Sequence, residues 1–85
     1  DLTRERPTEI NMKIKVALIE KEELAGADGK LINLEFYANA DGSAENRAAF
    51  RYTPQGCVKF YGLVPEVAGA FEVGKQYFVD ITPAG

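Results

Sequence analysis

The chain contains no histidine, and its only cysteine is Cys57. The absence of histidine removes the side chain that most often acts as a general base or zinc ligand. One cysteine cannot form a disulfide within the chain, and a Ser-His or Cys-His nucleophile is excluded within one chain. We therefore predict no catalytic residues, no metal site and no cofactor, and a protein that is not an enzyme.

The chain also lacks an excess of basic residues and long apolar runs. Ten Lys and Arg residues are set against thirteen Asp and Glu residues, which gives a formal net charge of −3. Proteins that bind nucleic-acid duplexes without sequence preference usually present a basic face to the phosphates. No apolar run approaches the roughly 20 residues that span a bilayer, and no signal-peptide core precedes the first strand. We expect a soluble, intracellular protein with no membrane partner.

The residues that are present suit one small domain. The 85 residues are 46% hydrophobic and include nine Phe and Tyr side chains, each of which buries a large area in a core. Residues 1–11 are mostly polar and show no clean period, whereas a strand pattern begins at Met12. We predict an extended arm or leader over 1–11 and a single small β domain over 12–85. A vector-derived leader, an upstream start codon and a true arm are the three alternatives for 1–11.

Hydrophobic alternation predicts five strands. Ile14, Val16 and Leu18 fall on one face of the first strand, as period two requires of a half-buried strand. Asp28-Gly29 is typical of a hairpin turn and predicts antiparallel pairing of the first two strands. The predicted strands cover 12–20, 31–38, 49–53, 57–63 and 76–82.

Two short helical segments interrupt the strands. Ser43 suits a helix N-cap before one turn over 44–49. Pro65 suits the first position of a helix of at most two turns within 64–75. The order of elements predicts a mainly β fold, a small five-stranded antiparallel barrel or sandwich in SH3-like order, with one short helix before the last strand.

A polar cluster near the first helical turn is a candidate binding site. Arg47 and Arg51 are spaced four apart, and with Asn46 and Tyr52 they could hold an anion, because guanidinium groups match phosphate and stack on aromatic rings. The alternative is that both arginines pair with Glu45 or Glu35 on a solvated surface.

Three aromatic side chains fall on the predicted outward faces of strands: Tyr37, Tyr61 and Phe78. They could form a subunit interface, a platform on which nucleic-acid bases stack, or a second buried layer. Ile19 and Cys57, also predicted to face outward, favour the interface. The charged run of Glu20, Lys21, Glu22 and Glu23 is predicted to be a solvated face or the end of a strand.

The second half of the chain contains the patterns Gly-Ser-x-Glu-Asn, Tyr-Thr-Pro-x-Gly and Gly-Lys-x-Tyr-x-Val-Asp. In these patterns it resembles a family of small proteins encoded by tailed bacteriophages, and the resemblance covers about residues 12–84. The matching positions are Gly42, Ser43, Glu45, Asn46, Phe50, Arg51, Tyr52, Thr53, Pro54, Gly56, Phe71, Gly74, Lys75, Tyr77, Val79 and Asp80. The resemblance implies a source in the cytoplasm of an infected bacterial host, and it supplies no catalytic residues.

These observations give three hypotheses. The first is a non-enzymatic phage accessory protein that acts by binding, as a homo-oligomer. The second is a protein that binds nucleotides or single-stranded nucleic acid. The third is a minor structural component of the virion.

Overall fold

The structure of the chain is a computed structural model that describes residues 11–85. These residues form four strands and two short helices joined by loops. The strands form one antiparallel sheet in the order β3-β2-β1-β4. In chain order the elements are β1 (Met12–Gly26), β2 (Gly29–Ala38), α1 (Ala44–Ala49), β3 (Cys57–Leu63), α2 (Pro65–Ala68) and β4 (Gln76–Ile81). The prediction of an arm or leader over 1–11 falls, except for Asn11, outside the described residues.

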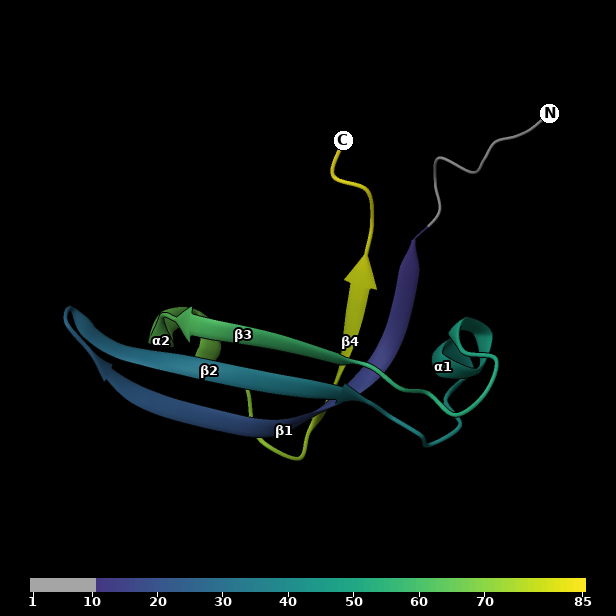
Figure 1. The fold of residues 1–85 in the computed structure, drawn as a ribbon, viewed down its shortest axis with the longest axis horizontal. Coiled ribbons are helices and arrows are strands. Elements are labelled where there is room, and N and C mark those ends of the chain that lie inside the picture. Colours follow the sequence, from purple (N-terminus) through teal and green to yellow (C-terminus); the bar gives the residue numbers. More distant parts are fainter. Residues whose placement is uncertain (1–10) are drawn as a thin grey trace.

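Strand β1 is long and bent, and it belongs to two pairs. Met12 to Ala17 pair with β4, whereas Val16 to Gly26 pair with β2. Figure 1 shows the first part of β1 rising beside β4 and the second part running along β2. Ile19 is an extra residue at the bend, because Leu18 pairs with Phe36 and Glu20 already pairs with Glu35. Such a bulge bends a strand and strengthens its twist.

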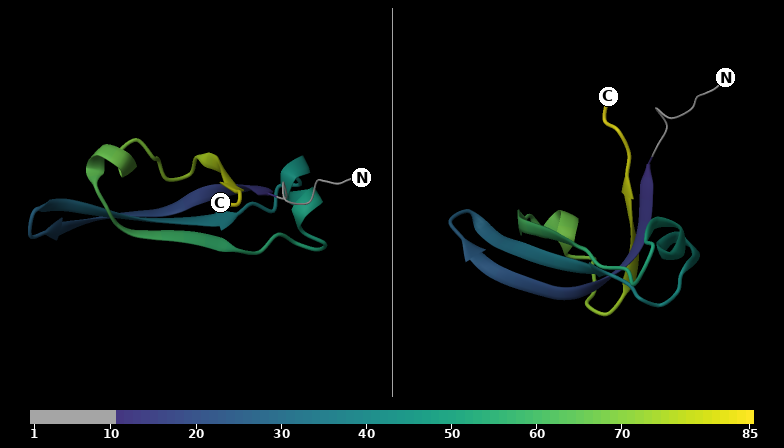
Figure 2. Two further views of the ribbon diagram at one scale, coloured as in Figure 1. Left: turned by 90° about the horizontal axis from the view of Figure 1, so that it is seen from above. Right: turned by 45° about the vertical axis from the view of Figure 1, so that its right-hand side comes forward.

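The hydrophobic core lies on one face of the sheet, which we call the core face. Its buried members are Ile14, Val16, Leu18, Ile32, Leu34, Phe36 and Ala68. Phe36 is the centre of the aromatic packing, since its ring makes edge-on contacts with Phe60, Phe71 and Tyr77 at centroid distances of 6.2, 5.8 and 5.8 Å. Figure 2 shows α2 and the segment after it on one side of the strands, where they cover part of this core.

Most of the predicted elements are confirmed. The strands at 12–20, 31–38, 57–63 and 76–82 exist, and the first continues to Gly26. The hairpin turn precedes Gly29, whose φ of 130° is a conformation that favours glycine. The Ser43 hydroxyl accepts a hydrogen bond from the backbone N–H of Asn46, as expected of an N-cap. The helix that begins at Pro65 is also present.

The fifth strand, at 49–53, and the five-stranded barrel or sandwich were wrong predictions, because the described strands form one open sheet of four. Helix α1 continues through Ala49, and the N–H of Phe50 donates to Asn46 O at 2.9 Å in a helical bond, so it is not free for a ladder. Strand β3 pairs directly with β2, which leaves no place for a strand between them. Because β3 and β4 lie at opposite edges, the sheet stays open.

Candidate functional site

Helix α1 is fastened to the sheet by one buried side chain, that of Asn46. Its Oδ1 accepts from the backbone N–H of Lys15 at 2.7 Å, and its Nδ2 donates to Lys15 O at 2.9 Å and to Asn39 O at 2.7 Å. Strand β2 ends at Ala38, so Asn46 serves the backbone of β1 where the neighbouring strand is missing. Asn46 is 0% exposed, which is expected only of a polar group with satisfied partners.

The loop before α1 is held by Asp41. Its carboxylate accepts from the Ser43 N–H at 3.0 Å and lies 3.5 Å from Lys15 Nζ. The hydrogen bond from Ser43, followed by the charge of Lys15, lowers the pKa of the Asp41 carboxyl below its ordinary value. The Asp41 carboxylate is therefore ionised at neutral pH and is occupied by groups of its own loop and by Lys15.

An open hollow of about 370 Å³ lies beside α1, and we call it the α1 hollow. It is lined by Ala40, Gly42, Asn46, Arg47, Phe50, Arg51, Tyr52, Thr53 and Pro54. Among residues 11–85 the lining contains two arginines and no carboxylate. The Arg47 guanidinium donates to the carbonyl of Gly42, which fixes its direction at the rim. Tyr52 is 84% exposed and leaves its ring open to solvent.

All four residues predicted to bind a ligand thus line one hollow. Asn46 differs from the other three, however, because its Nδ2 and its Oδ1 are hydrogen-bonded to the backbone of Lys15 and Asn39. Arg47, Arg51 and Tyr52 are exposed, and within residues 11–85 neither arginine forms a salt bridge to Glu45 or Glu35. The three exposed side chains are the ones that can meet a ligand.

The second candidate surface is the face of the sheet opposite the core, which we call the outer face. Its apolar members are Ala17, Ile19, Leu24, Leu31, Tyr37, Cys57, Tyr61 and Phe78. Tyr37, Tyr61 and Phe78 are 39%, 67% and 52% exposed. The pairing registers place the Cα atom of Tyr37 roughly 12–14 Å from those of Tyr61 and Phe78, and they place Tyr61 and Phe78, on opposite edge strands, roughly twice as far apart. The rings are therefore spread over the face and do not form one stack.

Charged groups alternate with these rings. The Tyr37 hydroxyl donates to Glu35 at 3.2 Å, and this bond raises the pKa of Tyr37. Lys59 Nζ lies 4.0 Å from the same carboxylate, whose charge raises the pKa of Lys59. Lys13 Nζ lies 4.7 Å above the centre of the Phe78 ring, a cation–π contact. Sequence patterns show only that these residues share a face, because the cross-strand partners come from distant segments.

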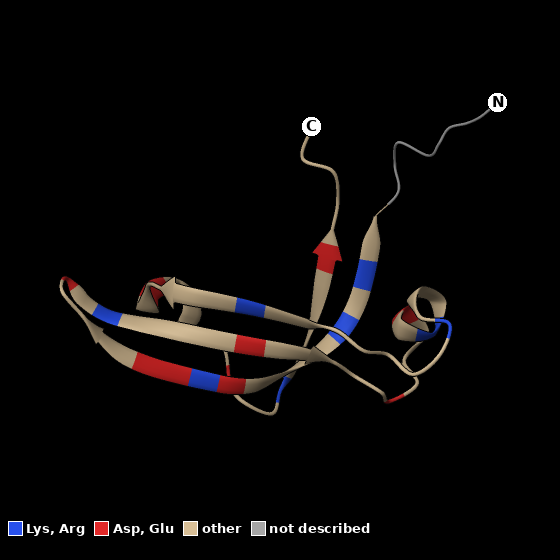
Figure 3. Cartoon of the chain, viewed as in Figure 1, with Lys and Arg blue, Asp and Glu red and all other residues tan. Residues whose placement is uncertain are grey.

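Charge is unevenly distributed along β1. Figure 3 shows blue positions on its first half, near α1, and a largely red stretch on the half that pairs with β2. The first half carries Lys13 and Lys15, and the second carries Glu20, Glu22 and Glu23. The half of β1 that contacts α1 is therefore its basic half.

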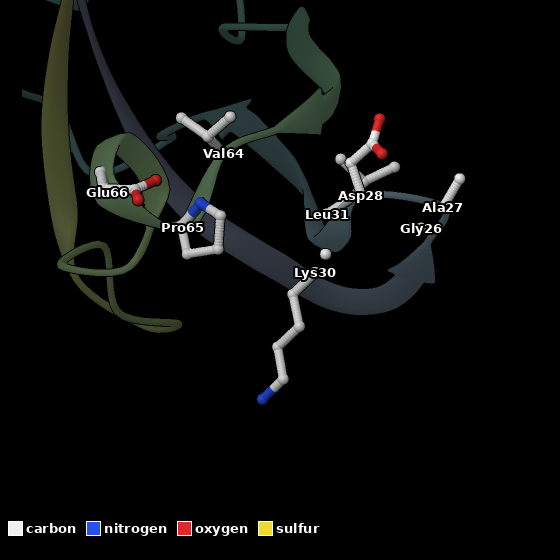
Figure 4. A pocket seen from close by; sticks show the side chains of 9 residues that line it. Gly26, Ala27, Asp28, Lys30, Leu31, Val64, Pro65 and Glu66 are labelled. Carbon is white, nitrogen blue, oxygen red and sulfur yellow. The ribbon is translucent and has the colours of Figure 1, made fainter.

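A larger hollow, of about 440 Å³, lies at the tip of the β1–β2 hairpin, but its polar groups do not converge. Figure 4 shows the Lys30 side chain pointing away from the carboxylates of Asp28 and Glu66. Lys30 is instead 3.7 Å from Glu23, on the neighbouring strand. This arrangement offers a ligand no set of groups that act together.

Within residues 11–85, no group of three or more His, Cys, Asp or Glu side chains is placed to hold a metal ion. No helix in the same range has the length and apolar character needed to cross a membrane. Comparison of the chain with protein-family models, with curated proteins and with solved structures finds no significant match.

Proposed function

We propose that the protein is a non-enzymatic binding protein that works as a homo-oligomer, joined through the outer face of its sheet. The observation that carries this proposal is the exposure of Tyr37, Tyr61 and Phe78 on one face that no other described element covers. Large aromatic side chains usually bury most of their area, and tyrosine and phenylalanine are enriched in interfaces.

The edges of the sheet support the same proposal. Strands β3 and β4 each have one side without a partner among residues 11–85. An unpaired edge presents free backbone N–H and C=O groups, which readily pair with another chain. Apolar side chains on the outer face and open edges at both ends together favour contact between copies.

Single-stranded nucleic acid is a weaker candidate for the outer face. Stacking on the three rings would draw a phosphate backbone across the carboxylates of Glu35 and Asp80, which share that face with them. Lys13, Lys15 and Lys59 offset this charge only in part, since Lys15 and Lys59 already pair with acids.

Light scattering during size-exclusion chromatography tests the proposal. We expect the wild type to have a mass of two or more chains at micromolar concentration, and the double variant Tyr61→Ser, Phe78→Ser to have the mass of one. Loss of two such contacts should weaken association by about 2 kcal/mol or more, which is more than tenfold. Val73→Ser, an equally exposed apolar position outside the outer face, is the control. A wild type of single-chain mass would contradict the proposal.

Two narrower proposals concern where the protein acts. Similarity to the bacteriophage pattern supports an accessory protein of an infected bacterial cell, and the open sheet edges would also suit a minor component of the virion. Mass spectrometry of purified phage particles separates the two. Presence of the chain in particles at a stoichiometric amount supports the virion component, and its absence removes that role.

A further inference from the structure

We propose that the α1 hollow binds a phosphate monoester that carries an aromatic base, that is, a nucleoside monophosphate. The site lies on α1 and the loops around it, whereas the proposed interface lies on the strands. A test of one proposal therefore does not decide the other.

The charge of the hollow selects an anion. In a chain with a net charge of −3, the lining contributed by residues 11–85 has Arg47 and Arg51 and no acid. The adjacent Asp41 is turned to its own loop, where Ser43 and Lys15 occupy its carboxylate. Planar guanidinium groups bind phosphate oxygens through paired N–H donors, and two of them suit a dianionic phosphate better than one.

The hollow is held in shape before a ligand arrives. Asn46 fixes α1 to Lys15 of β1 through two hydrogen bonds and to the Asn39 carbonyl through a third, and the next residue is Arg47. Gly42 O accepts from the Arg47 guanidinium and directs it along the rim. Phe50, which packs against the core, anchors the chain just before Arg51. Groups fixed in this way lose little conformational entropy when they bind.

Tyr52 supplies the part of the site that recognises a ring. Its side chain is 84% exposed and contributes nothing to the core, although an aromatic residue usually buries most of its area. An open tyrosine face stacks on a nucleobase, and stacking of this kind tolerates any base. The volume of about 370 Å³ lies within the range of small-ligand sites and can hold about one nucleotide.

Isothermal titration calorimetry in low salt tests the site with AMP and UMP as probes. We expect both to bind, inorganic phosphate to bind at least about tenfold more weakly, and adenosine to show no binding. Arg51→Gln and Tyr52→Ala should each weaken AMP binding by about tenfold or more, since each removes one recognised part of the ligand. Lys30→Gln, which removes a cation at the other end of the sheet, should bind AMP like the wild type.

Several outcomes would overturn the proposal. These are no heat with either nucleotide, unchanged binding by Arg51→Gln, and equal binding of inorganic phosphate and AMP. Binding of a short oligothymidine, but not of AMP, would assign the site to single-stranded nucleic acid, and binding of a polyglutamate peptide alone would assign it to an acidic protein partner. Thermal denaturation checks that the variants fold, and Tyr52→Leu replaces Tyr52→Ala if the smaller side chain unfolds the loop. A titration of the Tyr61→Ser, Phe78→Ser variant keeps the result independent of self-association.

Discussion

Asn46 supplies with one side chain what a neighbouring strand would supply with its backbone. Its amide has the same donor and acceptor groups as a peptide, and it meets both the N–H and the C=O of Lys15. Strand β2 stops pairing with β1 at Val16, and without Asn46 the first half of β1 would expose a free edge there. The position of α1, and with it the α1 hollow, depends on this residue.

Replacement of Asn46 by aspartate should destabilise the fold while preserving its shape. The new carboxylate would face the carbonyls of Lys15 and Asn39 without a proton to donate. We expect the free energy of unfolding to fall by about 2–4 kcal/mol, the cost of buried groups left unpaired. Urea denaturation measures the change, with Asn11→Asp at an exposed position as the matched control. Wild-type stability in Asn46→Asp would refute the structural role.

Asp41 makes the free energy of unfolding depend on pH through the loop before α1. Its folded-state pKa is lowered, chiefly by the hydrogen bond from Ser43, so the stabilisation is present above the unfolded-state pKa and is lost as the pH falls through the folded-state pKa. Asp41→Asn should therefore lose less stability than the wild type between about pH 6 and about pH 3. Denaturation at both pH values tests this, and Asp28→Asn, in the exposed hairpin turn, should keep the wild-type dependence. An unchanged dependence in Asp41→Asn would assign the acid sensitivity to other carboxylates.

The sequence predicts some of these roles and cannot predict others. The Ser43 cap is local, because donor and acceptor are three residues apart, and the pattern of the segment shows it. The partners of Asn46 include Lys15, 31 residues away, and no local pattern indicates that contact. The sequence therefore predicts Asn46 as a ligand-binding residue beside Arg47 and Arg51. The structure does place Asn46 in the lining of the α1 hollow, but its side-chain amide is already bonded to the backbone.

At the scale of elements, the bulge at Ile19 changes which residues face the core. Before it, the even-numbered residues of β1 point to the core face, and after it Lys21 pairs with Leu34 and points there instead. Lys21 Nζ donates to Gly69 O at 3.0 Å and to Phe71 O at 2.9 Å, so it ties the segment after α2 to the hairpin. The prediction of a purely solvated charged run was thus wrong for Lys21, since alternation alone does not show a bulge.

Lys21→Met should loosen the segment between α2 and β4. The methionine retains much of the apolar stem but loses both hydrogen bonds, at a cost of about 1 kcal/mol. Hydrogen exchange should become faster at the amides of Phe71, Glu72 and Gly74 than at those of β2. Lys30→Met, which removes only a surface pair at the hairpin, should leave this exchange unchanged. Equal exchange in both variants would show that packing alone holds the segment.

The remaining strands show how far alternation carries a prediction. Residues 31–38 and 57–63 have long alternating patterns, and both are strands. Residues 49–53 alternate too, but over a stretch so short that the pattern also fits the end of a helix followed by a bend. The capped helix occupies Ala49 and the backbone of Phe50, and β2 is already paired on both sides. What decided this segment was the helical hydrogen bond made by Phe50, together with the pairing of β2 on both sides.

At the scale of the whole molecule, the open sheet replaces the predicted barrel. The order of elements along the chain is compatible with either, because it does not state which edges meet. Here β1 sits inside the sheet and pairs with β4, which places β3 and β4 far apart. A closed barrel would have no free edge, whereas this sheet has two, and its outer face has no cover within residues 11–85.

The rate at which the Cys57 thiol is chemically labelled tests whether copies of the chain contact one another through the outer face. It is exposed on the edge strand β3, directly opposite Tyr37, so a partner that covers Tyr37 should also shield its thiol. We expect a bulky maleimide to label Cys57 rapidly in dilute protein and slowly in concentrated protein, in proportion to the fraction of free protomers. The labelled protein should then have the mass of one chain, because the adduct occupies the interface.

A second thiol position makes this measurement specific to the face. In a Cys57→Ser background, Val73→Cys places a thiol on the exposed loop before β4, away from the outer face. Its labelling should be equally fast at all protein concentrations, because the loop stays open in the proposed oligomer. If Cys57 is labelled at a constant rate while the protein is an oligomer by light scattering, the copies meet elsewhere, and the open edge of β4 becomes the next surface to test. If both thiols are shielded, the contact extends around the molecule to the loop before β4, and an interface confined to the outer face is ruled out.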